Sequence, residues 1–276
     1  MKSNILLFGP VGTGKTTSIR TIIENCNRDI FITSLEPGIE TILGETDPFR
    51  VHWHYVPPAK ISWEMMGKIL RQASMLQIDQ IIKSPIPFKS EFTQFLDVYS
   101  ACENFICDRT GKEFGPVDDL GEKDVWVIDG LTSLCRMAIQ LLNGAAILRT
   151  QPGWYGAQNV VENFLNKCTG DTKCSFILLA HEDRLISPLT GASIHSAQSL
   201  GNALTSRLAT MFDEIIYSRR EGNKFTWSTS EDGMPDLKAR ILPFSNNLEQ
   251  DFNLILENFS EPNLKPANGK KGKRSG

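Results

Sequence analysis

The chain has 276 residues, of which 41% are hydrophobic and 22% charged, as in a globular protein with one large α/β domain or two small ones. Its formal net charge of −3 argues against general coating of nucleic acid but is compatible with a local basic groove. The sequence shows neither a signal-peptide pattern nor the roughly 20 consecutive apolar residues that span a bilayer. We therefore expect a cytoplasmic protein without membrane association, whose six cysteines are reduced.

The first 38 residues predict a βαβ unit. Residues 4–8, "NILLF", are apolar and followed by glycine, which is typical of a buried parallel strand. Residues 15–26 place isoleucines on one helical face, and residues 29–38, "DIFITSLEPG", form a second β-rich run. A strand, a helix and a strand in this order indicate an α/β fold.

Residues 57–121 are less regular and predict a helical insertion on the side of the sheet. They contain two probable helices, at 62–82 and at 90–106. Cys102 and Cys107 form a pair with the spacing of a zinc knuckle. A structural zinc site needs four ligands and no second pair lies nearby, so metal binding here is the weaker alternative.

Further apolar runs continue the predicted sheet. Residues 124–134 contain a strand that ends in Asp129, and residues 175–184 contain one that ends in His181. Such alternation of strands and helices predicts a mostly parallel, doubly wound sheet with ligands at its carboxyl edge. The last strands are expected in the runs 209–220, "KFTWSTS" (224–230) and "DLKARILPF" (236–244).

A phosphate-binding loop follows the first strand. The segment "GPVGTGKT" fits G-x-x-x-x-G-K-[ST], in which glycines let backbone N–H groups surround phosphate oxygens. Lys15 is expected to reach the β- and γ-phosphates of ATP, and Thr16 to ligate Mg²⁺ together with Asp129. The predicted nucleotide-binding residues are Gly9, Pro10, Val11, Gly12, Thr13, Gly14, Lys15, Thr16 and Thr17.

In many P-loop ATPases, the glutamate that activates water directly follows the aspartate at the end of this strand. Here Gly130 follows Asp129, so the water-activating acid has to come from another part of the chain. Glu36 ends the strand after the phosphate-loop helix and is the first candidate. Glu40 and Asp183 are competitors, and Glu36 could instead be a solvated loop acid.

This set of residues resembles the RecA recombinase core, and in particular the phage-encoded, core-only RecA-like ATPases grouped with single-strand annealing recombinases. The resemblance covers about residues 3–258, so we expect one ATPase domain at 1–258 and a disordered basic tail at 259–276. It implies that His181 senses the γ-phosphate, where the family commonly has glutamine. It also implies that Lys238 and Arg240 project from one strand toward the ATP of a neighbouring copy.

The resemblance further implies two DNA-binding loops. One corresponds to residues 143–159, with a turn packed on the sheet as the alternative, and the other follows His181. Single-stranded DNA could be bound by Arg149, by stacking on Trp154 and Tyr155, and by Arg184.

The resulting hypothesis is a Mg²⁺-dependent ATP hydrolase that binds single-stranded DNA in phage recombination or annealing and forms a homo-oligomer, either a filament or a ring. One alternative is a helicase-like, packaging or replication motor acting on duplex DNA. Another is a small-molecule kinase, although residues 57–121 hold only Arg71 and Arg109 for an arginine-rich lid. A non-hydrolysing switch is a third.

Overall fold

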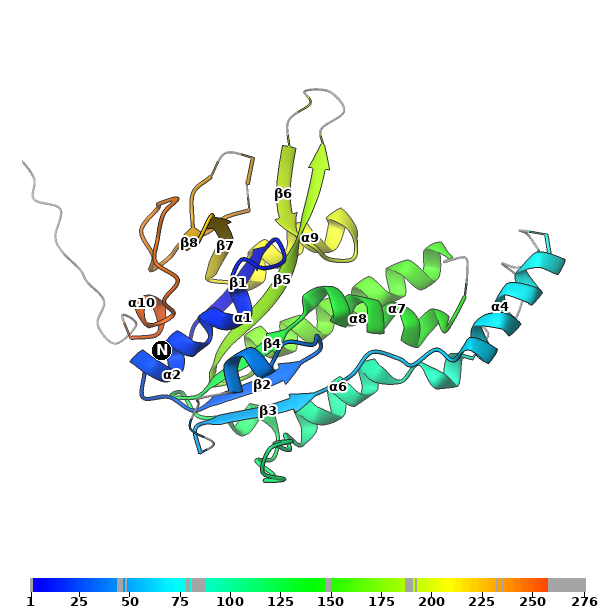
Figure 1. The fold of residues 1–276 in the computed structure, drawn as a ribbon, viewed down its shortest axis with the longest axis horizontal. Helices are drawn as coiled ribbons and strands as arrows, with labels where there is room; N and C mark the ends of the chain where they lie inside the picture. Colours follow the sequence, from blue (N-terminus) through cyan, green and yellow to red (C-terminus); the bar gives the residue numbers. More distant parts are fainter. Residues whose placement is uncertain are drawn as a thin grey trace, which may run out of the picture.

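In the described residues, eight strands form a sheet with the order β3-β2-β4-β5-β1-β7-β8, and β6 pairs with β5 outside this path (Figure 1). This computed structural model describes residues 2–43, 47, 49–77, 80, 88–146, 150–186, 191, 193–231, 233–234 and 236–257. The strands are β1 (Asn4–Gly9), β2 (Ile30–Ser34), β3 (Val51–Tyr55), β4 (Val125–Asp129), β5 (Ser175–Ile186), β6 (Ser193–Ala197), β7 (Glu214–Glu221) and β8 (Lys224–Ser228). All pairings are parallel except β5 with β6 and β7 with β8. The predicted fold class, a mostly parallel α/β sheet, is confirmed.

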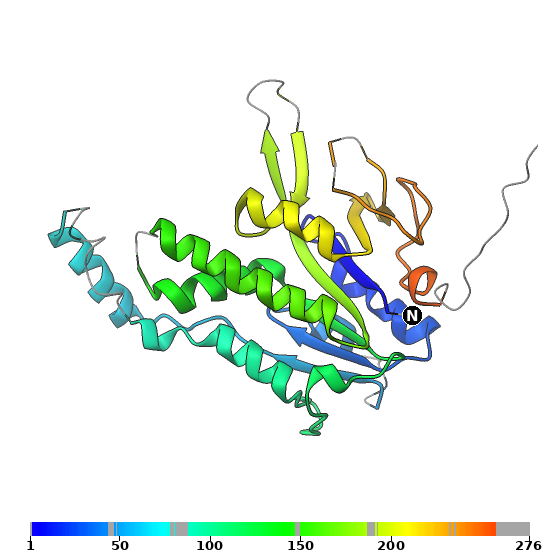
Figure 2. The same cartoon turned by 180° about the vertical axis from the view of Figure 1, so that it is seen from behind.

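Helices cover both faces of this sheet (Figures 1 and 2). The longer ones are α4 (Trp63–Met75), α6 (Gln94–Glu103), α7 (Leu131–Asn143), α8 (Gln151–Gly170) and α9 (Gly201–Met211). The shorter ones are α1 (Lys15–Ser18), α2 (Arg20–Asn25), α3 (Glu40–Leu43) and α10 (Asn253–Leu256), with 3-10 turns η1 (Lys89–Glu91) and η2 (Val117–Asp119). Among the described residues, none of these helices has both the length and the apolar character of a membrane crossing.

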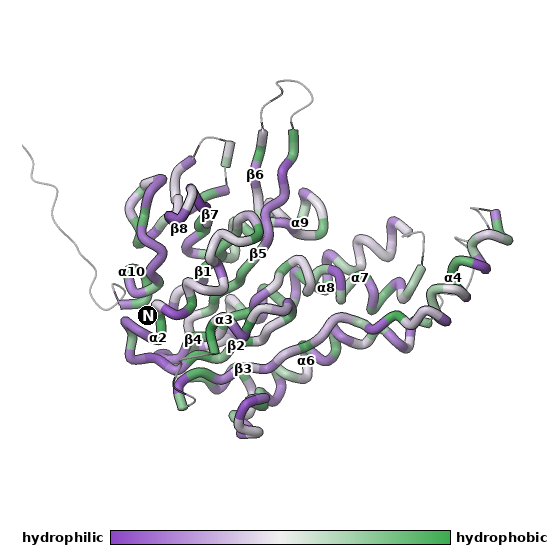
Figure 3. Tube along the Cα trace, viewed as in Figure 1, coloured by the Kyte–Doolittle hydropathy of each residue, from purple (hydrophilic) through white to green (hydrophobic). Residues whose placement is uncertain are grey.

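The central strands are buried on both faces, as a doubly wound sheet requires. On β1, Leu6 and Phe8 belong to the core under α6, α7, α8 and α9, whereas Ile5 and Leu7 belong to the core under α1, α2, α3 and α10. Alternate residues of β4 and β5 divide between the two cores in the same way. Figure 3 shows apolar colour along parts of these strands.

The strand order brings the predicted site residues to one edge. β5 lies between β1 and β4, so that Gly9 is level with His181 and Ser34 is level with Asp129. The loops that follow β1, β2, β4 and β5 therefore leave the sheet on the same side. Ligands of such sheets bind at this carboxyl edge.

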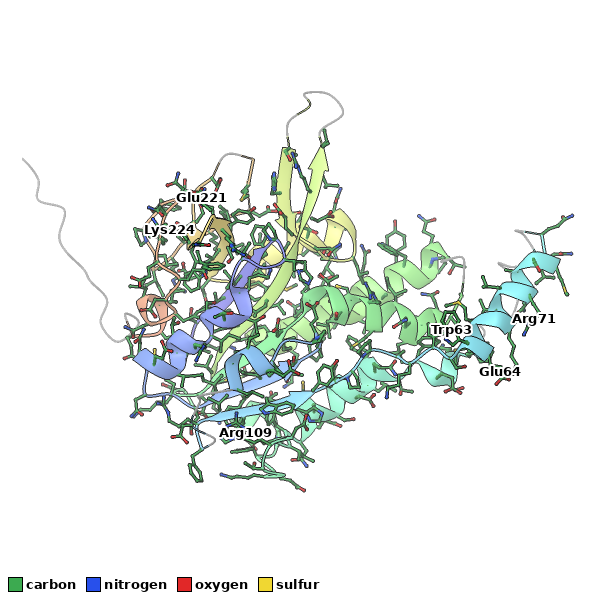
Figure 4. All side chains as sticks on the ribbon, in the orientation of Figure 1. Trp63, Glu64, Arg71, Arg109, Glu221 and Lys224 are labelled. Carbon is green, nitrogen blue, oxygen red and sulfur yellow. The ribbon has the colours of Figure 1, made fainter. Side chains whose placement is uncertain are left out.

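The helical insertion is present, with one strand before it that the sequence analysis missed. β3 pairs with β2 at the edge of the sheet. Its sequence "VHWHY" carries two histidines, which hid it from a search for apolar runs. α4 and α6 lie within the predicted helices 62–82 and 90–106, and residues 78–79 and 81–87 lie outside the described residues. Figure 4 shows Trp63 and Arg71 on α4, which extends away from the sheet.

Residues 151–159 form neither the predicted loop nor the alternative turn, because α8 begins at Gln151. Thr150 is the N-cap, and its hydroxyl accepts a hydrogen bond of 3.3 Å from the Gly153 N–H. Pro152 lies in the first turn, where its missing N–H costs nothing. Trp154 and Tyr155 are thus helical residues.

The segment after His181 is also more regular than a loop. β5 continues to Ile186 and pairs with β6 in an antiparallel hairpin that rises from the sheet edge (Figure 1). Residues 187–190 and 192, at its tip, lie outside the described residues. The hairpin corrects the expectation of an irregular loop here.

The prediction of a strand at 236–244 is wrong. Only Lys238 forms a bridge, with Ile215 of β7. The next N–H groups, of Arg240 and Ile241, donate to the buried Glu214 carboxylate at 2.7 and 2.6 Å. Because a side chain takes up these donors, the segment cannot continue a ladder with a strand.

The C-terminal segment closes one core. Phe252 is 0% exposed, and its ring centroid lies 4.8 Å from that of Trp227 on β8. Two residues earlier, the Gln250 amide donates to Thr13 O at 3.1 Å. Packing at Phe252 therefore also supports the phosphate loop.

We expect Phe252→Ala to lower the free energy of unfolding by about 3–5 kcal/mol, because it leaves a cavity against Trp227. Chemical denaturation measures this change. The control Phe244→Ala removes a side chain that is 75% exposed and should change stability by less than about 0.5 kcal/mol. Equal stability of the two variants would contradict the packing role of Phe252.

Candidate ATP-hydrolysis site

The phosphate-binding loop connects β1 to α1 in the conformation that its glycines allow. Gly12 and Gly14 have φ values of 76° and 84°, where other residues are strained. At Gly9, a Cβ atom would lie 2.2 Å from Ser218 O of the neighbouring strand β7. The glycine pattern thus serves both the loop and its contact with the sheet.

Lys15 lies inside this loop. Its Nζ donates to Gly9 O and Pro10 O, both at 2.8 Å. Burial lowers the pKa of Lys15, and the charges of Asp129, Glu36 and Glu182 oppose this effect. An anion that enters the loop would replace two neutral acceptors and favour the ammonium form.

Thr16 and Asp129 meet at the end of β4, with 2.9 Å between Thr16 Oγ1 and Asp129 Oδ2. Burial raises the pKa of Asp129 to about 6, and the negative charge of Glu36 adds to this, while the Thr16 hydrogen bond lowers it. A hydroxyl and a buried carboxylate side by side are the oxygen donors that Mg²⁺ prefers. The donor set therefore fits the predicted metal, which would neutralise charge on the phosphates when bound.

Glu36 lies at the same edge, and both oxygens of its carboxylate are engaged. Oε1 accepts from the Ser133 hydroxyl at 3.1 Å, and Oε2 lies 2.8 Å from His181 Nε2. Burial alone would raise the pKa of Glu36. The hydrogen bond and charge of His181, followed by the Ser133 hydrogen bond, outweigh burial and leave this pKa below its usual value.

The lack of a side chain at Gly130 leaves room for the side chain of Glu36, which follows the end of β2. Gly130 has φ 125°, and a Cβ atom there would lie 3.0 Å from Glu36 Cγ and 3.2 Å from Oε1. The space beside the end of β4 is thus filled by the Glu36 side chain. A side chain at position 130 would therefore press against Glu36.

His181 contacts Glu36 in this structure. Its Nδ1 is buried and has no hydrogen-bond partner among the described residues. The ring is therefore held in the structure by the contact of Nε2 with Glu36. Its role as a γ-phosphate sensor stays a prediction.

A cavity of about 520 Å³ adjoins the phosphate loop, and the sequence analysis missed its residues. Phe225 of β8 and Gln250 line it opposite Gly14 and Thr17. These two residues stand more than 200 positions from the loop and belong to no motif, so only the fold could reveal them. The remaining lining residues are Gly12, Ser18, Arg20, Thr21 and Glu24.

The competing acids are less well placed than Glu36. The carboxylates whose charges act on Lys15 are Asp129, Glu36 and Glu182, and neither Glu40 nor Asp183 is among them. Glu40 begins α3, and Asp183 lies on β5 where the hairpin leaves the sheet. Glu182 is a further acidic residue that the sequence analysis did not consider.

Lys238 and Arg240 were predicted to act at the ATP of a neighbouring copy. They lie at the amino edge of the sheet, opposite the edge that holds the phosphate loop of the same chain. Lys238 Nζ donates to Phe212 O at 2.8 Å, and an Arg240 NH group lies 3.0 Å from Asp213 Oδ1. Asp213 donates its N–H to Asn4 O at the start of β1, whereas the phosphate loop follows the end of β1. The premise that both residues share a strand face is wrong, and their role at a neighbour's ATP stays a prediction.

The described DNA-binding candidates lie on two different elements, Trp154 and Tyr155 on α8 and Arg184 on β5. Trp154 is partly buried against the core beneath α8, and Tyr155 is 53% exposed. Arg184 lies on the β5–β6 hairpin, where its Nε donates to Ser193 Oγ at 2.7 Å. Arg149 lies outside the described residues.

The weaker zinc alternative gains no support. Within the part of the chain that the structure describes, no group of three or more His, Cys, Asp and Glu residues could hold a metal ion. Cys102 packs against the core, and burial raises its pKa to about 12.

Comparisons with known proteins agree with this geometry in the N-terminal region. A family model described as "ATPase family associated with various cellular activities (AAA)" matches residues 5–49. No curated protein matches the sequence. This match contains the complete phosphate loop and Glu36.

Among the solved structures that are similar to this chain are two ATPases of type III secretion systems. One is a prototypical ATPase from the type III secretion system of pathogenic bacteria, with 13% identity and a TM-score of 0.41, which covers 80% of this chain and 53% of that chain. Another is the assembled ATPase EscN in complex with its central stalk EscO from enteropathogenic E. coli, with 14% identity, a TM-score of 0.44, and coverage of 87% and 47%. The chain spans about half the length of these proteins.

We expect Gly130→Ala to lower kcat for ATP hydrolysis at least about tenfold, because the methyl group displaces Glu36 and strains the backbone. The control Gly111→Ala also has a positive φ, of 68°, but nothing lies within 4 Å of its Cβ position. Steady-state kinetics and thermal unfolding of both variants separate displacement of Glu36 from backbone strain. Wild-type kcat in Gly130→Ala would contradict the packing of Glu36 against position 130.

Proposed function

We propose that this ATPase couples MgATP hydrolysis to the binding of single-stranded DNA, in phage recombination or annealing. The observation that carries this proposal is the continuity of β5. The same strand contains His181 beside Glu36 and, three residues later, Arg184 on a hairpin that rises beyond the sheet. A phosphate bound at the hairpin would thus act on a strand that reaches the ATP site.

A row of polar contacts supports this coupling. Arg184 Nε donates to Ser193 Oγ, which lies 2.9 Å from His195 Nε2, and His195 Nδ1 contacts Glu182 Oε1. Glu182 in turn accepts from the Tyr217 hydroxyl at 3.2 Å and acts electrostatically on Lys15. Arg184, drawn toward a DNA phosphate, would loosen one end of this row and change the field at the other.

Hydrolysis would use the residues at the carboxyl edge in separate roles. Lys15 holds the β- and γ-phosphates, and Thr16 with Asp129 would hold Mg²⁺. Glu36 orients the attacking water and accepts its proton as the bond between the γ-phosphorus and the bridging oxygen breaks. The Nε2 atom of His181 lies beside Glu36, and it would donate a hydrogen bond to the γ-phosphate once ATP is bound.

The cavity beside the loop is the proposed site of the base. Phe225 offers a ring face for stacking, and the Gln250 side chain is oriented by its own contacts. Its Nε2 lies within 3.2 Å of Thr13 O, Ser218 Oγ and Thr226 O, so Oε1 is left as an acceptor. An acceptor favours the amino group of adenine over the carbonyl of guanine.

Oligomerisation follows from the position of the two basic residues. Lys238 and Arg240 are exposed at the amino edge of the sheet, away from the phosphate loop of their own chain. If these cations act in hydrolysis, they act in another copy. We therefore propose head-to-tail association, as a filament or a ring, in which one copy supplies cations to the next.

Lys15→Ala should abolish ATP turnover, because it removes the charge that stabilises the transferred phosphate. Phosphate release measures this loss, with Lys68→Ala as a control, since Lys68 on α4 pairs only with Glu64 in the described residues. Full activity of Lys15→Ala would remove the site itself from consideration.

Single-stranded DNA should raise the ATPase rate of the wild type at low salt, and Arg184→Ala should lose most of this stimulation while it keeps the basal rate. Arg71→Ala is the control, because Arg71 is an exposed arginine on α4 far from the hairpin (Figure 4). Unchanged turnover with DNA would contradict the DNA role. Equal stimulation by duplex DNA would instead favour a motor that acts on duplex.

A further inference from the structure

Glu36 poses a problem of position. A base gains its effect from fixed geometry, and a displacement of about 1 Å can cost a large part of the rate. Glu36 lies two residues beyond the end of β2, directly before Pro37 and Gly38. Its carboxylate therefore needs support from outside its own strand.

The backbone of Glu36 is held first. Leu35 N–H donates to Asp129 O at 2.9 Å, which extends the contact between β2 and β4 by one residue. The Ser34 hydroxyl donates to Glu36 O at 2.8 Å. These two bonds fix the start of the side chain but leave the rotamers of the carboxylate open.

Two donors then hold the carboxylate, and they differ in what else they can do. His181 Nε2 reaches Oε2 from β5, at the position level with Gly9 of the phosphate loop. Nε2 carries at most one hydrogen, so this atom cannot donate to Glu36 and to a phosphate oxygen at once. Whenever His181 turns to ATP, its bond to Glu36 is lost.

The Ser133 hydroxyl is not required to bind a phosphate oxygen, so it can stay bonded to Glu36. Ser133 lies in the first turn of α7, which begins at Leu131, and its hydroxyl donates to Glu36 Oε1 at 3.1 Å, beside Gly130. α7 is packed on the core through Leu131 and Leu134, both 0% exposed, so the hydroxyl is carried by a rigid element. The positive N-terminal end of this 13-residue helix also favours a negative carboxylate.

We propose that Ser133 is the positioning residue of the ATPase: it keeps Glu36 directed at the attacking water after His181 has left for the γ-phosphate. Ser133 occupies Oε1, so Oε2 is the oxygen that becomes available to water. The inference rests on the proposed role of Glu36 as the base. It adds a residue that neither the motifs nor the resemblance assigned.

Ser133→Ala should lower kcat about tenfold and leave the affinity for ATP unchanged, because the hydroxyl touches the base and not the loop. Ser133→Thr keeps a hydroxyl at the same place and should keep at least half of the wild-type kcat. Ser206→Ala is the matched control, since this serine donates only to Asn202 O within α9 in the described residues. Turnover is measured by phosphate release, and affinity by equilibrium binding of a non-hydrolysable ATP analogue.

A double-mutant cycle separates positioning from a merely structural role. Glu36→Gln alone should lower kcat at least about 100-fold. Adding Ser133→Ala to Glu36→Gln should cause no further loss, because the hydroxyl acts only through the carboxylate. Losses that multiply would overturn the proposal, and so would wild-type kcat in Ser133→Ala.

The same data show which hypothesis fails. If Glu36→Gln hydrolyses ATP like the wild type, the assignment of the base is wrong. If Glu36→Gln is inactive and Ser133→Ala is fully active, only the role of Ser133 is wrong.

Discussion

The close packing of the Glu36 side chain against Gly130 lies at the end of β4, and the organisation of the site depends on this contact. Gly130 leaves space there, and Glu36 fills it from the neighbouring strand β2. The carboxylate then meets the first turn of α7 on one side and β5 on the other. Three elements converge on one acid because the residue after Asp129 has no side chain of its own.

The strand order makes this convergence possible. β5 separates β1 from β4, so that the end of β5 faces the phosphate loop and the Asp129 end of β4 at once. Strands buried on both faces hold their register through two apolar cores, and a shift by one residue would exchange them. The positions of the site residues are therefore set by packing far below the loops that carry them.

Much of this could be predicted from local sequence. The phosphate loop and the buried strands β1, β4 and β5 were found, since their signals are contiguous runs of apolar residues and a spaced motif. Glu36 was proposed from its place after β2, and the contacts that hold it were not. The sequence analysis missed Ser133, Phe225 and Gln250. Their place in the site depends on contacts between segments that are distant in the sequence, and a single sequence does not reveal these contacts.

The errors have physical causes of the same kind. The segment at 236–244 reads as a strand, but the buried Glu214 carboxylate takes its N–H groups. The resemblance predicted a loop at residues 143–159, but Thr150 caps α8 and Pro152 lies in its first turn. In both cases a side-chain oxygen accepts hydrogen bonds from backbone N–H groups, and the sequence pattern alone does not reveal such contacts.

Gln250 ties the last described segment of the chain to Thr13 in the phosphate loop. The ribosome produces the loop first and this buttress almost 240 residues later, so the nascent chain emerges with a nucleotide motif that lacks its support. β1 pairs with β5 and β7, which are both synthesised later, so it cannot join the sheet until they are present. ATP capture should thus begin late in synthesis, and a polypeptide cut short before residue 250 would carry the signature of an ATPase without a finished binding site.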